Sequence, residues 1–366
     1  MAPTAARGLA ALVTALATAC GGAERPAVIG YAFQISGQPS VAVARDEVAS
    51  WPPGGPEIRF VFDSVAAGEP ADVEIERAQR LVAVPAIVGV VGHAGSRGTL
   101  AGAPVYNEAG LPHVAPTSTS RLLRRAGPWT FSLAPDDSTE GAFIADFVVA
   151  SLGARAVSVF YVNDEYGEGL RDGVRAHLLT RGVTLLNEVS FGPGSDVALL
   201  VEASLRRGRP DAVISAGRWR ETAALARHLS ARVPGIRVVA GDGAMYLPGL
   251  AEAAGPAAAA LYVVDFWVSD PADSASRQFV ERYRRVAGTD PLGPQAMSHD
   301  ALMLLARAVR DVGADREAIR RYLESLGRER PPYPGITGPI SFGPGRRTNL
   351  VMTRLVDGRP QRVAWP

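Results

Sequence analysis

Several polar residues in this chain have the types and the spacing needed to bind charged groups. Ser96 stands at the expected start of a helix, where its hydroxyl and its backbone N–H can be offered to an anion. Thr117 and Thr119 lie in a polar segment after a short apolar run, and Asp242 lies between two glycines after another such run. The same residues also fit a helix cap, a polar turn and a generic Gly-Asp-Gly turn. Residue types alone therefore leave a binding role and a structural role open for each of them.

A catalytic site is not indicated by the spacing of these residues. Ser96 follows Gly95 directly, so the Gly-x-Ser-x-Gly pattern of a nucleophile elbow fails, and the nearby His93 is interpreted as a structural residue at a strand end. The 5 His residues are scattered and the single Cys is Cys20, so no metal-ligand spacing occurs, and the sequence has neither a P-loop nor a strand-borne GxGxxG. We expect no enzyme activity, no metal and no cofactor, although folding can still bring two carboxylates together.

The composition indicates what kind of molecule must position these residues. The chain has 366 residues, of which 47% are hydrophobic and 20% are charged. This is typical of a globular protein with about two domains. The formal net charge is +1, so the composition provides no field that would favour nucleic acid or an anionic membrane.

The N-terminal segment has the pattern of an export signal. One positive charge within residues 1–7 precedes an apolar stretch over residues 8–19, which is too short to span a bilayer of roughly 30 Å. The stretch ends at Cys20 and resembles a bacterial lipobox, in which this cysteine is lipidated, although Ala17 stands where Leu is usual. We predict a signal peptide over residues 1–19, a lipidated Cys20 and a linker to residue 26. An ordinary secretory signal with an incidental cysteine is the alternative.

Short apolar runs alternate with stretches of helical spacing after residue 26. The alternation predicts an α/β fold with buried parallel strands, and a near-break over residues 124–137 indicates two similar lobes rather than one large sheet. Strands are expected over residues 28–33, 58–62, 87–91, 112–115, 156–161, 212–215, 238–240, 261–266, 338–342 and 350–357. Helices are expected over residues 71–84, 97–109, 141–152, 167–179, 197–206, 220–232, 278–286 and 295–312.

Residues 87–123 form the most specific stretch, with the sequence IVGVVGHAGSRGTLAGAPVYNEAGLPHVAPTSTSRLL. A strand, a Gly-Ser turn, a helix, a short strand and a polar Pro-Thr-Ser segment follow one another there. In this order the stretch resembles the periplasmic leucine/isoleucine/valine-binding protein family, the type I solute receptors of ABC transporters. Matches at residues 28–37 (VIGYAFQISG), 159–170 (VFYVNDEYGEGL) and 239–243 (VAGDG) extend the resemblance over nearly all of the chain after residue 26.

The resemblance implies that the chain recognises the two charges of an α-amino acid. A buried carboxylate or ammonium is tolerated only when hydrogen-bonding or charged groups pair with it. In the family, the serine that matches Ser96 contacts the ligand carboxylate. The loop that matches Thr117 and Thr119 supplies a backbone carbonyl from the first position, and a hydroxyl with an N–H from the third.

Four further residues, all later in the sequence, also take their expected roles from the resemblance. Asp242 matches the acidic residue that binds the ligand ammonium, which is usually Glu, and the shorter Asp reaches less far. Tyr166 matches an aromatic residue that borders the ligand. Arg218 is the positional match to a second aromatic residue, whereas the adjacent Trp219 better suits a pocket wall.

One region departs from the family pattern. Residues 38–56 are shorter than usual and contain no tyrosine, so one wall of the side-chain pocket is altered. The ligand therefore stays open among a branched-chain amino acid, another amino acid, an amide or urea-like compound and an aromatic acid.

The resemblance implies a two-lobed periplasmic-binding-protein type I fold, in which each lobe is a mostly parallel sheet flanked by helices. Residues 27–135 and 267–343 are expected to form lobe 1, and residues 136–266 and 344–366 lobe 2. The chain is expected to cross between the lobes three times, near Pro135, Phe266 and Gly343, and these crossings form the hinge.

The function implied is that of an extracytoplasmic receptor of an ABC importer, which captures an amino acid (branched-chain-like) or a related small polar ligand between two closing lobes. The expected partners are ABC permease subunits and, through the lipid anchor, the membrane, but no nucleic acid. We expect an exported monomer in the periplasm or at the cell surface. A lipoprotein that senses a ligand and signals through a partner receptor is the alternative.

Overall fold

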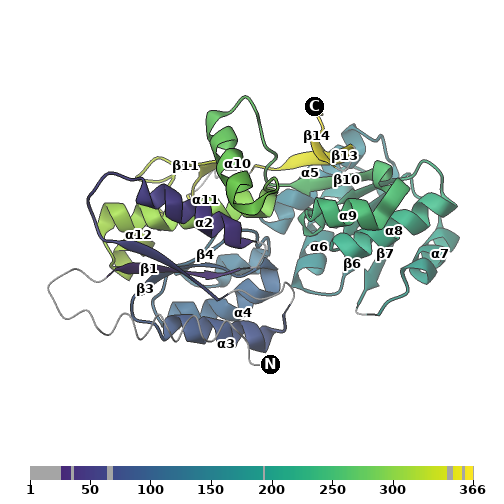
Figure 1. Ribbon diagram of the computed structural model, residues 1–366. Coiled ribbons are helices and arrows are strands. Elements are labelled where there is room, and N and C mark those ends of the chain that lie inside the picture. Colours follow the sequence, from purple (N-terminus) through teal and green to yellow (C-terminus); the bar gives the residue numbers. More distant parts are fainter. Residues whose placement is uncertain are drawn as a thin grey trace, which may run out of the picture. The chain divides into compact units, whose positions relative to one another are not determined.

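The chain divides into two compact units in a computed structural model that describes residues 26–33, 37–63, 69–192, 194–343, 349–356 and 359–365 (Figure 1). Unit 1 comprises Met1–Ala134 and Ser269–Thr348, and unit 2 comprises Pro135–Val268 and Asn349–Pro366. Each unit therefore combines segments that are far apart in the sequence.

The expected lobe boundaries can be compared with these units. The sequence places the chain crossings near Pro135, Phe266 and Gly343, and the two units meet along the chain at 134/135, 268/269 and 348/349. The predicted signal peptide and Cys20 lie outside the described residues. Within the described part of the chain, no helix combines the length and the apolar character needed to cross a membrane.

Unit 1 is built around a five-stranded sheet of order β2-β1-β3-β4-β5, in which every neighbouring pair is parallel. Every residue of β1 and β3 is buried, because helices cover both faces of the sheet. Figure 1 shows α2, α11 and α12 on one face and α3 and α4 on the other. The strands are β1 (Ala27–Ala32), β2 (Ile58–Phe62), β3 (Ile87–Gly92), β4 (His113–Ala115) and β5 (Thr130–Ser132). The helices are α2 (Gln38–Ala49), α3 (Ala71–Val82), α4 (Gly95–Glu108), α10 (Ser274–Ala287), α11 (Gly293–Val312) and α12 (Arg316–Ser325), with a 3-10 turn η2 (Arg121–Arg125) and a hairpin of β11 (Tyr333–Gly335) and β12 (Gly338–Ile340).

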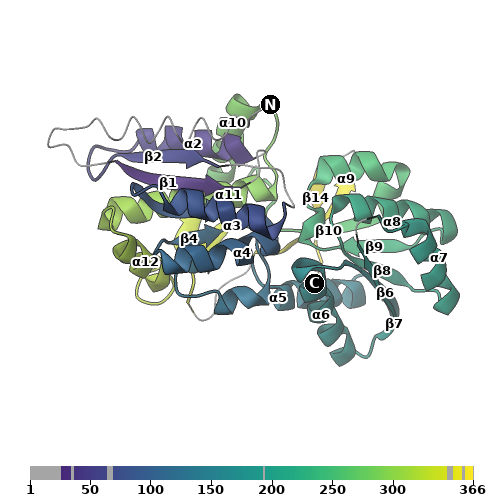
Figure 2. The same cartoon turned by 90° about the horizontal axis from the view of Figure 1, so that it is seen from below.

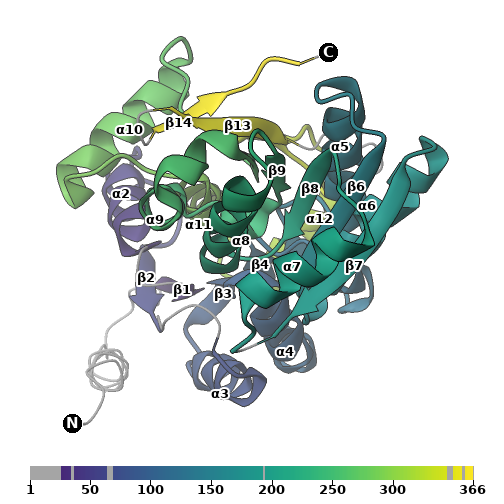
Figure 3. The ribbon, with the colours of Figure 1, turned by 90° about the vertical axis from the view of Figure 1, so that its right-hand side faces the viewer.

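Unit 2 contains a seven-stranded sheet of order β14-β13-β10-β9-β8-β6-β7. Its strands β6 to β10 are parallel, whereas β13 pairs antiparallel with β10 and β14 antiparallel with β13. Figures 2 and 3 show α5 and α6 on one face and α7, α8 and α9 on the other. The strands are β6 (Ala156–Val162), β7 (Thr184–Phe191), β8 (Ala212–Ala216), β9 (Arg237–Ala240), β10 (Leu261–Asp265), β13 (Val351–Val356) and β14 (Arg359–Arg362). The helices are α5 (Asp137–Ala150), α6 (Glu165–Thr180), α7 (Val197–Arg207), α8 (Trp219–Arg232) and α9 (Leu247–Ala254), with 3-10 turns η3 (Asp242–Ala244) and η4 (Gly255–Ala260).

Aspartate side chains begin five of the helices. In each case the carboxylate accepts a hydrogen bond from a backbone N–H of the first turn, which satisfies a donor that the helix itself cannot use. The capping residues are Asp136 for α5, Asp164 for α6, Asp196 for α7, Asp273 for α10 and Asp315 for α12. Helix α4 has no such cap, since its N-cap residue is Ala94.

The predicted fold class is confirmed, and the structure adds elements that the patterns did not indicate. Strand β7 and helices α2, α9 and α12 were not expected. Residues 38–49, in the region that the sequence marks as shortened, form α2, which packs against α10 and α11.

Candidate functional site

The seven predicted binding residues share one structural position in their units. Each follows the carboxyl end of a parallel strand, which is where α/β sheets bind ligands, close to the point where the strand order reverses. The reversal lies between β1 and β3 in unit 1 and between β6 and β8 in unit 2. The residues are Ser96 after β3, Thr117 and Thr119 after β4, Tyr166 after β6, Arg218 and Trp219 after β8, and Asp242 after β9.

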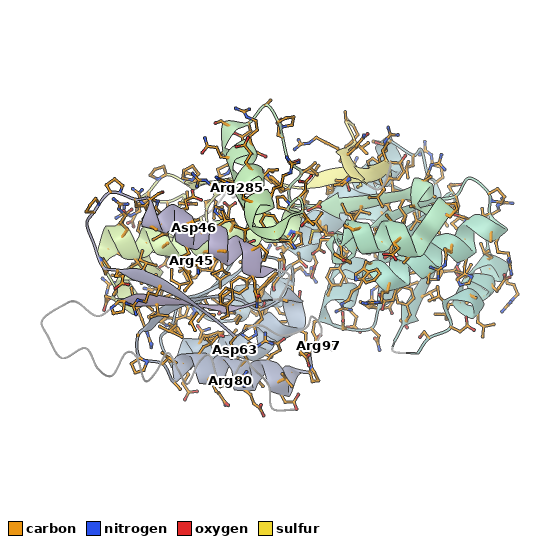
Figure 4. All side chains as sticks on the ribbon, viewed as in Figure 1. Arg45, Asp46, Asp63, Arg80, Arg97 and Arg285 are labelled. Carbon is orange, nitrogen blue, oxygen red and sulfur yellow. The ribbon has the colours of Figure 1, made fainter. Side chains whose placement is uncertain are left out.

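Ser96 is not the N-cap of its helix, contrary to the prediction. Helix α4 begins at Gly95, so Ser96 is its second residue, and the adjacent Arg97 marks this end of the helix in Figure 4. The N-cap is Ala94, which has extended backbone angles, and the chain turns into the helix at Gly95, whose positive φ of 77° favours glycine. The Ser96 side chain is only 3% exposed, and its hydroxyl has no hydrogen-bond partner among the described residues.

Serine side chains hold the loop that carries Thr117 and Thr119. The Ser118 hydroxyl shares a hydrogen bond of 2.5 Å with the Thr99 hydroxyl of α4, and Ser132 donates to the Ser118 carbonyl at 2.7 Å. Both threonines are buried. The loop is thus fixed against α4 and β5 by groups other than its two threonine hydroxyls.

A buried network of polar side chains lies next to the start of α4. His93 Nδ1 lies 2.6 Å from Glu74 Oε2, and His93 Nε2 lies 2.8 Å from the Tyr106 hydroxyl. Glu74 also pairs with Arg77 at 3.0 Å. Burial lowers the pKa of His93, and the bond to Glu74 works against that shift. His93 is therefore a structural residue of unit 1, in agreement with its interpretation from the sequence.

In unit 2, Tyr166 and the Gly-Asp-Gly turn are in direct contact. The Tyr166 hydroxyl accepts a hydrogen bond from Gly243 N at 2.7 Å. Neither glycine of the turn leaves room for a side chain: a Cβ on Gly243 would lie 2.6 Å from Tyr166 Cε1, and one on Gly241 would lie 2.8 Å from the Tyr166 hydroxyl. The two glycines are thus needed to bring the Asp242 backbone against the tyrosine.

Asp242 is held by a second acid that the sequence did not single out. Its backbone N–H donates to Glu140 Oε1 of α5 at 2.8 Å, and both side chains are buried. Burial raises the pKa of Asp242 to about 6, while hydrogen bonds from Glu140 and Tyr166 oppose this shift. Burial also raises the pKa of Glu140 well above its ordinary value, and the charge of Asp242 raises it further.

Arg218 and Trp219 lie side by side in the sequence but make different contacts. The Arg218 guanidinium donates to Asp164 Oδ2 at 2.6 Å and lies 6.0 Å from the centroid of the Tyr166 ring. Trp219 is half-buried and packs edge-on against Tyr246, with ring centroids 5.3 Å apart. The structure thus brings Tyr166, Arg218 and Asp242 together and places Trp219 beside them on α8.

Sequence reasoning missed Glu140 and Asp164. Both stand at helix starts that are rich in acids, a pattern that indicates capping and no further role. Only the fold shows that Glu140 reaches Asp242, which is 102 positions away in the sequence.

A surface groove of about 500 Å³ lies elsewhere on unit 1, between α2 and α10. Asp46 and Arg285, which are labelled in Figure 4, line it together with Glu47 and Arg282. Glu47 pairs there with Arg282 at 3.0 Å and with His299 at 3.1 Å. None of the predicted site residues lines this groove.

The fold and the position of the candidate site define a solute-binding protein of the periplasmic type. The chain belongs to the periplasmic binding protein family, because the family model of that description matches residues 31–355. This confirms the resemblance inferred from the sequence.

Named relatives agree with the family assignment. An amino acid binding protein of Pseudomonas aeruginosa is 28% identical over 244 residues, which cover 66% of this chain and 64% of that protein. A Leu/Ile/Val-binding protein homolog 1 of Brucella abortus is 25% identical over 257 residues, 69% of this chain and 67% of that protein. The chain thus aligns with somewhat less than two thirds of the first relative.

Solved structures share the fold at low sequence identity. A leucine binding protein from Thermotoga maritima has a TM-score of 0.83 at 24% identity and covers 92% of this chain and 97% of its own. A branched-chain amino acid transporter substrate binding protein from Streptococcus pneumoniae, in complex with isoleucine, has a TM-score of 0.80 at 20% identity, over 92% and 99% of the two chains. A solute binding protein from R. palustris in complex with benzoate has a TM-score of 0.78 at 17% identity, over 93% and 96%.

Proposed function

We propose that this protein captures an α-amino acid outside the cytoplasmic membrane and delivers it to the permease of an ABC importer. In this proposal Ser96 and Thr119 of unit 1 bind the ligand carboxylate, and the backbone carbonyl of Thr117 accepts from its ammonium. Unit 2 provides Tyr166, Arg218, Trp219 and Asp242 around the ammonium and the side chain. A ligand that contacts both sets stabilises a closed arrangement of the units, which the permease recognises.

The hydroxyl of Ser96 is the observation that carries the proposal. It is buried in the first turn of α4 and has no hydrogen-bond partner in the described part of the chain. No side chain caps this helix, so its N-terminal N–H groups have no side-chain acceptor. A ligand carboxylate there would accept from both kinds of donor and gain about 0.3–1 kcal/mol from the helix dipole, or more when partly buried.

Asp242 favours an amino acid over an acid without an ammonium. Benzoate is bound by one protein of the same fold, and leucine or isoleucine by others. A buried carboxylate with the Tyr166 hydroxyl beside it suits an ammonium, whereas an aromatic acid offers nothing to bind it. The proteins of this fold that were solved with isoleucine and with leucine are transporter substrate-binding proteins, which favours import over the sensing alternative.

The cellular setting is part of the proposal. Residues 1–19 direct export and are removed, Cys20 is lipidated, and the protein acts as a monomer at the periplasmic face or the cell surface. It makes no covalent change to its ligand, needs no cofactor and has no nucleic-acid partner.

Thermal unfolding against a panel of amino acids, amides and aromatic acids tests this function. A ligand at 100 times its Kd stabilises a protein by about 2.7 kcal/mol, which is an easily measured rise in Tm. We expect an α-amino acid to raise the Tm of the wild type and to have no effect on Asp242→Ala. If only compounds without an ammonium raise the Tm, the proposed ligand class is wrong.

A further inference from the structure

Two carboxyl groups from distant parts of the chain lie together at the Gly-Asp-Gly turn of unit 2. Glu140, in the first turn of α5, accepts the Asp242 N–H through Oε1 at 2.8 Å. The carboxyl groups of the two residues also interact with each other, which raises the pKa of Glu140 and lowers that of Asp242. Folding has therefore produced the carboxylate pair that the sequence left open.

Each member of the pair has a buried oxygen that no donor reaches. Glu140 Oε2 and Asp242 Oδ1 are both inaccessible to solvent and have no hydrogen-bond partner among the described residues. Two adjacent carboxylates in such a place repel each other, and each has one oxygen without a donor, so one of them retains a proton unless a cation arrives.

The surrounding charges do not supply that cation. Arg218 lowers the pKa of Asp242, but its guanidinium is paired with Asp164 at 2.6 Å and also interacts with Glu221 of α8. Asp137 of α5 raises the pKa of Glu140, and Asp242 raises that of Asp265 at the end of β10. Tyr166 of α6 is neutral, since burial raises its pKa well above 10. The acids of α5, η3 and β10 thus face one partly engaged arginine.

We propose that Glu140 is a second carboxyl of the ammonium subsite, which positions Asp242 and holds a proton that leaves when the ligand ammonium binds. The inference rests on the proposed function, because it assigns Asp242 to the ammonium. It extends that function by coupling the capture of each ligand to the release of a proton.

Glu140 has a different protonation state in the free protein and in the ligand-bound protein. In the free protein near neutral pH, Glu140 is a carboxylic acid that keeps its proton beside the Asp242 carboxylate. An incoming ammonium brings N–H donors and a positive charge, so both carboxylates become stable in the charged form and Glu140 releases its proton to solvent. The affinity for the ligand then falls as the pH decreases. At pH values where Glu140 is protonated in the free protein, the fall is up to about tenfold per pH unit.

The free protein gives the first test, by ¹³C NMR of the carboxyl groups across pH 3 to 9. We expect the Glu140 signal to remain that of a carboxylic acid at pH 7, and Glu140→Gln to remove one of the two coupled titrations. A Glu140 carboxyl that is ionised at pH 7 in the ligand-free protein overturns the proposal. This measurement does not depend on which ligand the protein binds.

Calorimetry with L-leucine and L-isoleucine, in two buffers of different ionisation enthalpy, gives the second test. We expect the wild type to release a large fraction of one proton per ligand at pH 7, and Glu140→Gln to release almost none and to lose most of the pH dependence of its affinity. Asp265→Asn is the matched control, since it removes another buried acid at the same sheet edge.

The outcomes separate the two proposals. Proton release that persists in Glu140→Gln and disappears in Asp265→Asn contradicts the role of Glu140. If only compounds without an ammonium bind, the proposed function fails, and the NMR titration still decides whether Glu140 holds the proton.

Discussion

The buried hydroxyl of Ser96 lowers the stability of the free protein. A hydroxyl that is removed from water without a partner costs about 1–3 kcal/mol. Ser96 has no hydrogen-bond partner within the ranges that the structure describes, whereas Ser118 and Ser132 nearby both hydrogen-bond within unit 1. Residues of this kind persist where a ligand supplies the missing partner.

Ser96→Ala is expected to separate binding from stability. The variant should bind L-leucine about 10- to 100-fold more weakly, because a hydrogen bond to a charged group contributes about 1.5–3 kcal/mol. Its free energy of unfolding should be unchanged or higher, since no internal bond is lost. Isothermal calorimetry and urea unfolding measure the two effects.

Ser276→Ala is the matched control for that variant. Ser276 is another buried serine in the first turn of a helix of unit 1, but its hydroxyl accepts from Asp270 N at 3.0 Å. It should lose about 1 kcal/mol of stability and bind normally. An unchanged affinity in Ser96→Ala would remove Ser96 from the site.

The position of a single residue in the fold was predictable where it follows a recognisable strand, and its contacts were less so where the fold creates them. Ser96, Tyr166 and Asp242 each follow a strand that the sequence identifies as an apolar run. Glu140 could not be placed in the same way, because its partner lies 102 positions later and nothing local distinguishes it from a helix-start acid.

At the scale of elements, histidine side chains support the junction between β3, β4 and α4. His113 of β4 is buried, with Nε2 2.5 Å from the Gly92 carbonyl and its ring 4.5 Å from that of Tyr106. Burial lowers the pKa of His113 to about 3, helped by the charge of His93. The ring is therefore neutral in the folded protein at neutral pH.

The low pKa of His113 predicts a loss of stability in acid. An unfolded histidine has a pKa of about 6.5, so the contribution of His113 is complete above that pH and is lost as the pH falls from 6.5 towards 3. Between pH 7 and pH 4.5, the wild type should lose about 2 kcal/mol more than His113→Gln. Urea unfolding of both proteins at the two pH values measures this difference. Equal losses would show that the ring is protonated in the folded state.

Elements were predictable to the extent that their pattern is local. The fully buried strands β1 and β3 appear as continuous apolar runs. Strand β7 was missed because it lies at the edge of its sheet and reads TLLNEVSF, with only two of its eight residues buried. Helix α2 was missed because its residues lack a clear apolar face, and its place is set by packing on α10 and α11.

At the scale of the whole molecule, the last described strands, β13 and β14, complete the sheet of unit 2, whose other strands come much earlier in the sequence. Strand β13 pairs with β10, and the Thr353 hydroxyl donates to the Val263 carbonyl at 2.8 Å. In unit 1, helix α11 packs on both β1 and β3, each of which precedes it by two hundred residues or more. Segments from both halves of the chain are thus integral to each core.

The proposed lipid anchor gives a prediction at this scale. In a bacterial host, the wild type should sediment with membranes, and Cys20→Ser should be exported but found in the soluble fraction. Cell fractionation followed by mass spectrometry of the N-terminus measures both properties. A Cys20→Ser protein that still sediments with membranes would exclude the anchor.

The interleaved segments of the two units bear on when this protein can fold. Domains usually fold one after another as a chain emerges, the N-terminal one first. Here unit 1 needs Ser269–Thr348 and unit 2 needs Asn349–Pro366, so neither core is complete until the later segments have appeared. A chain that is translocated across a membrane from its N-terminus would therefore remain unfolded for most of the translocation. Both units would then fold together on the far side.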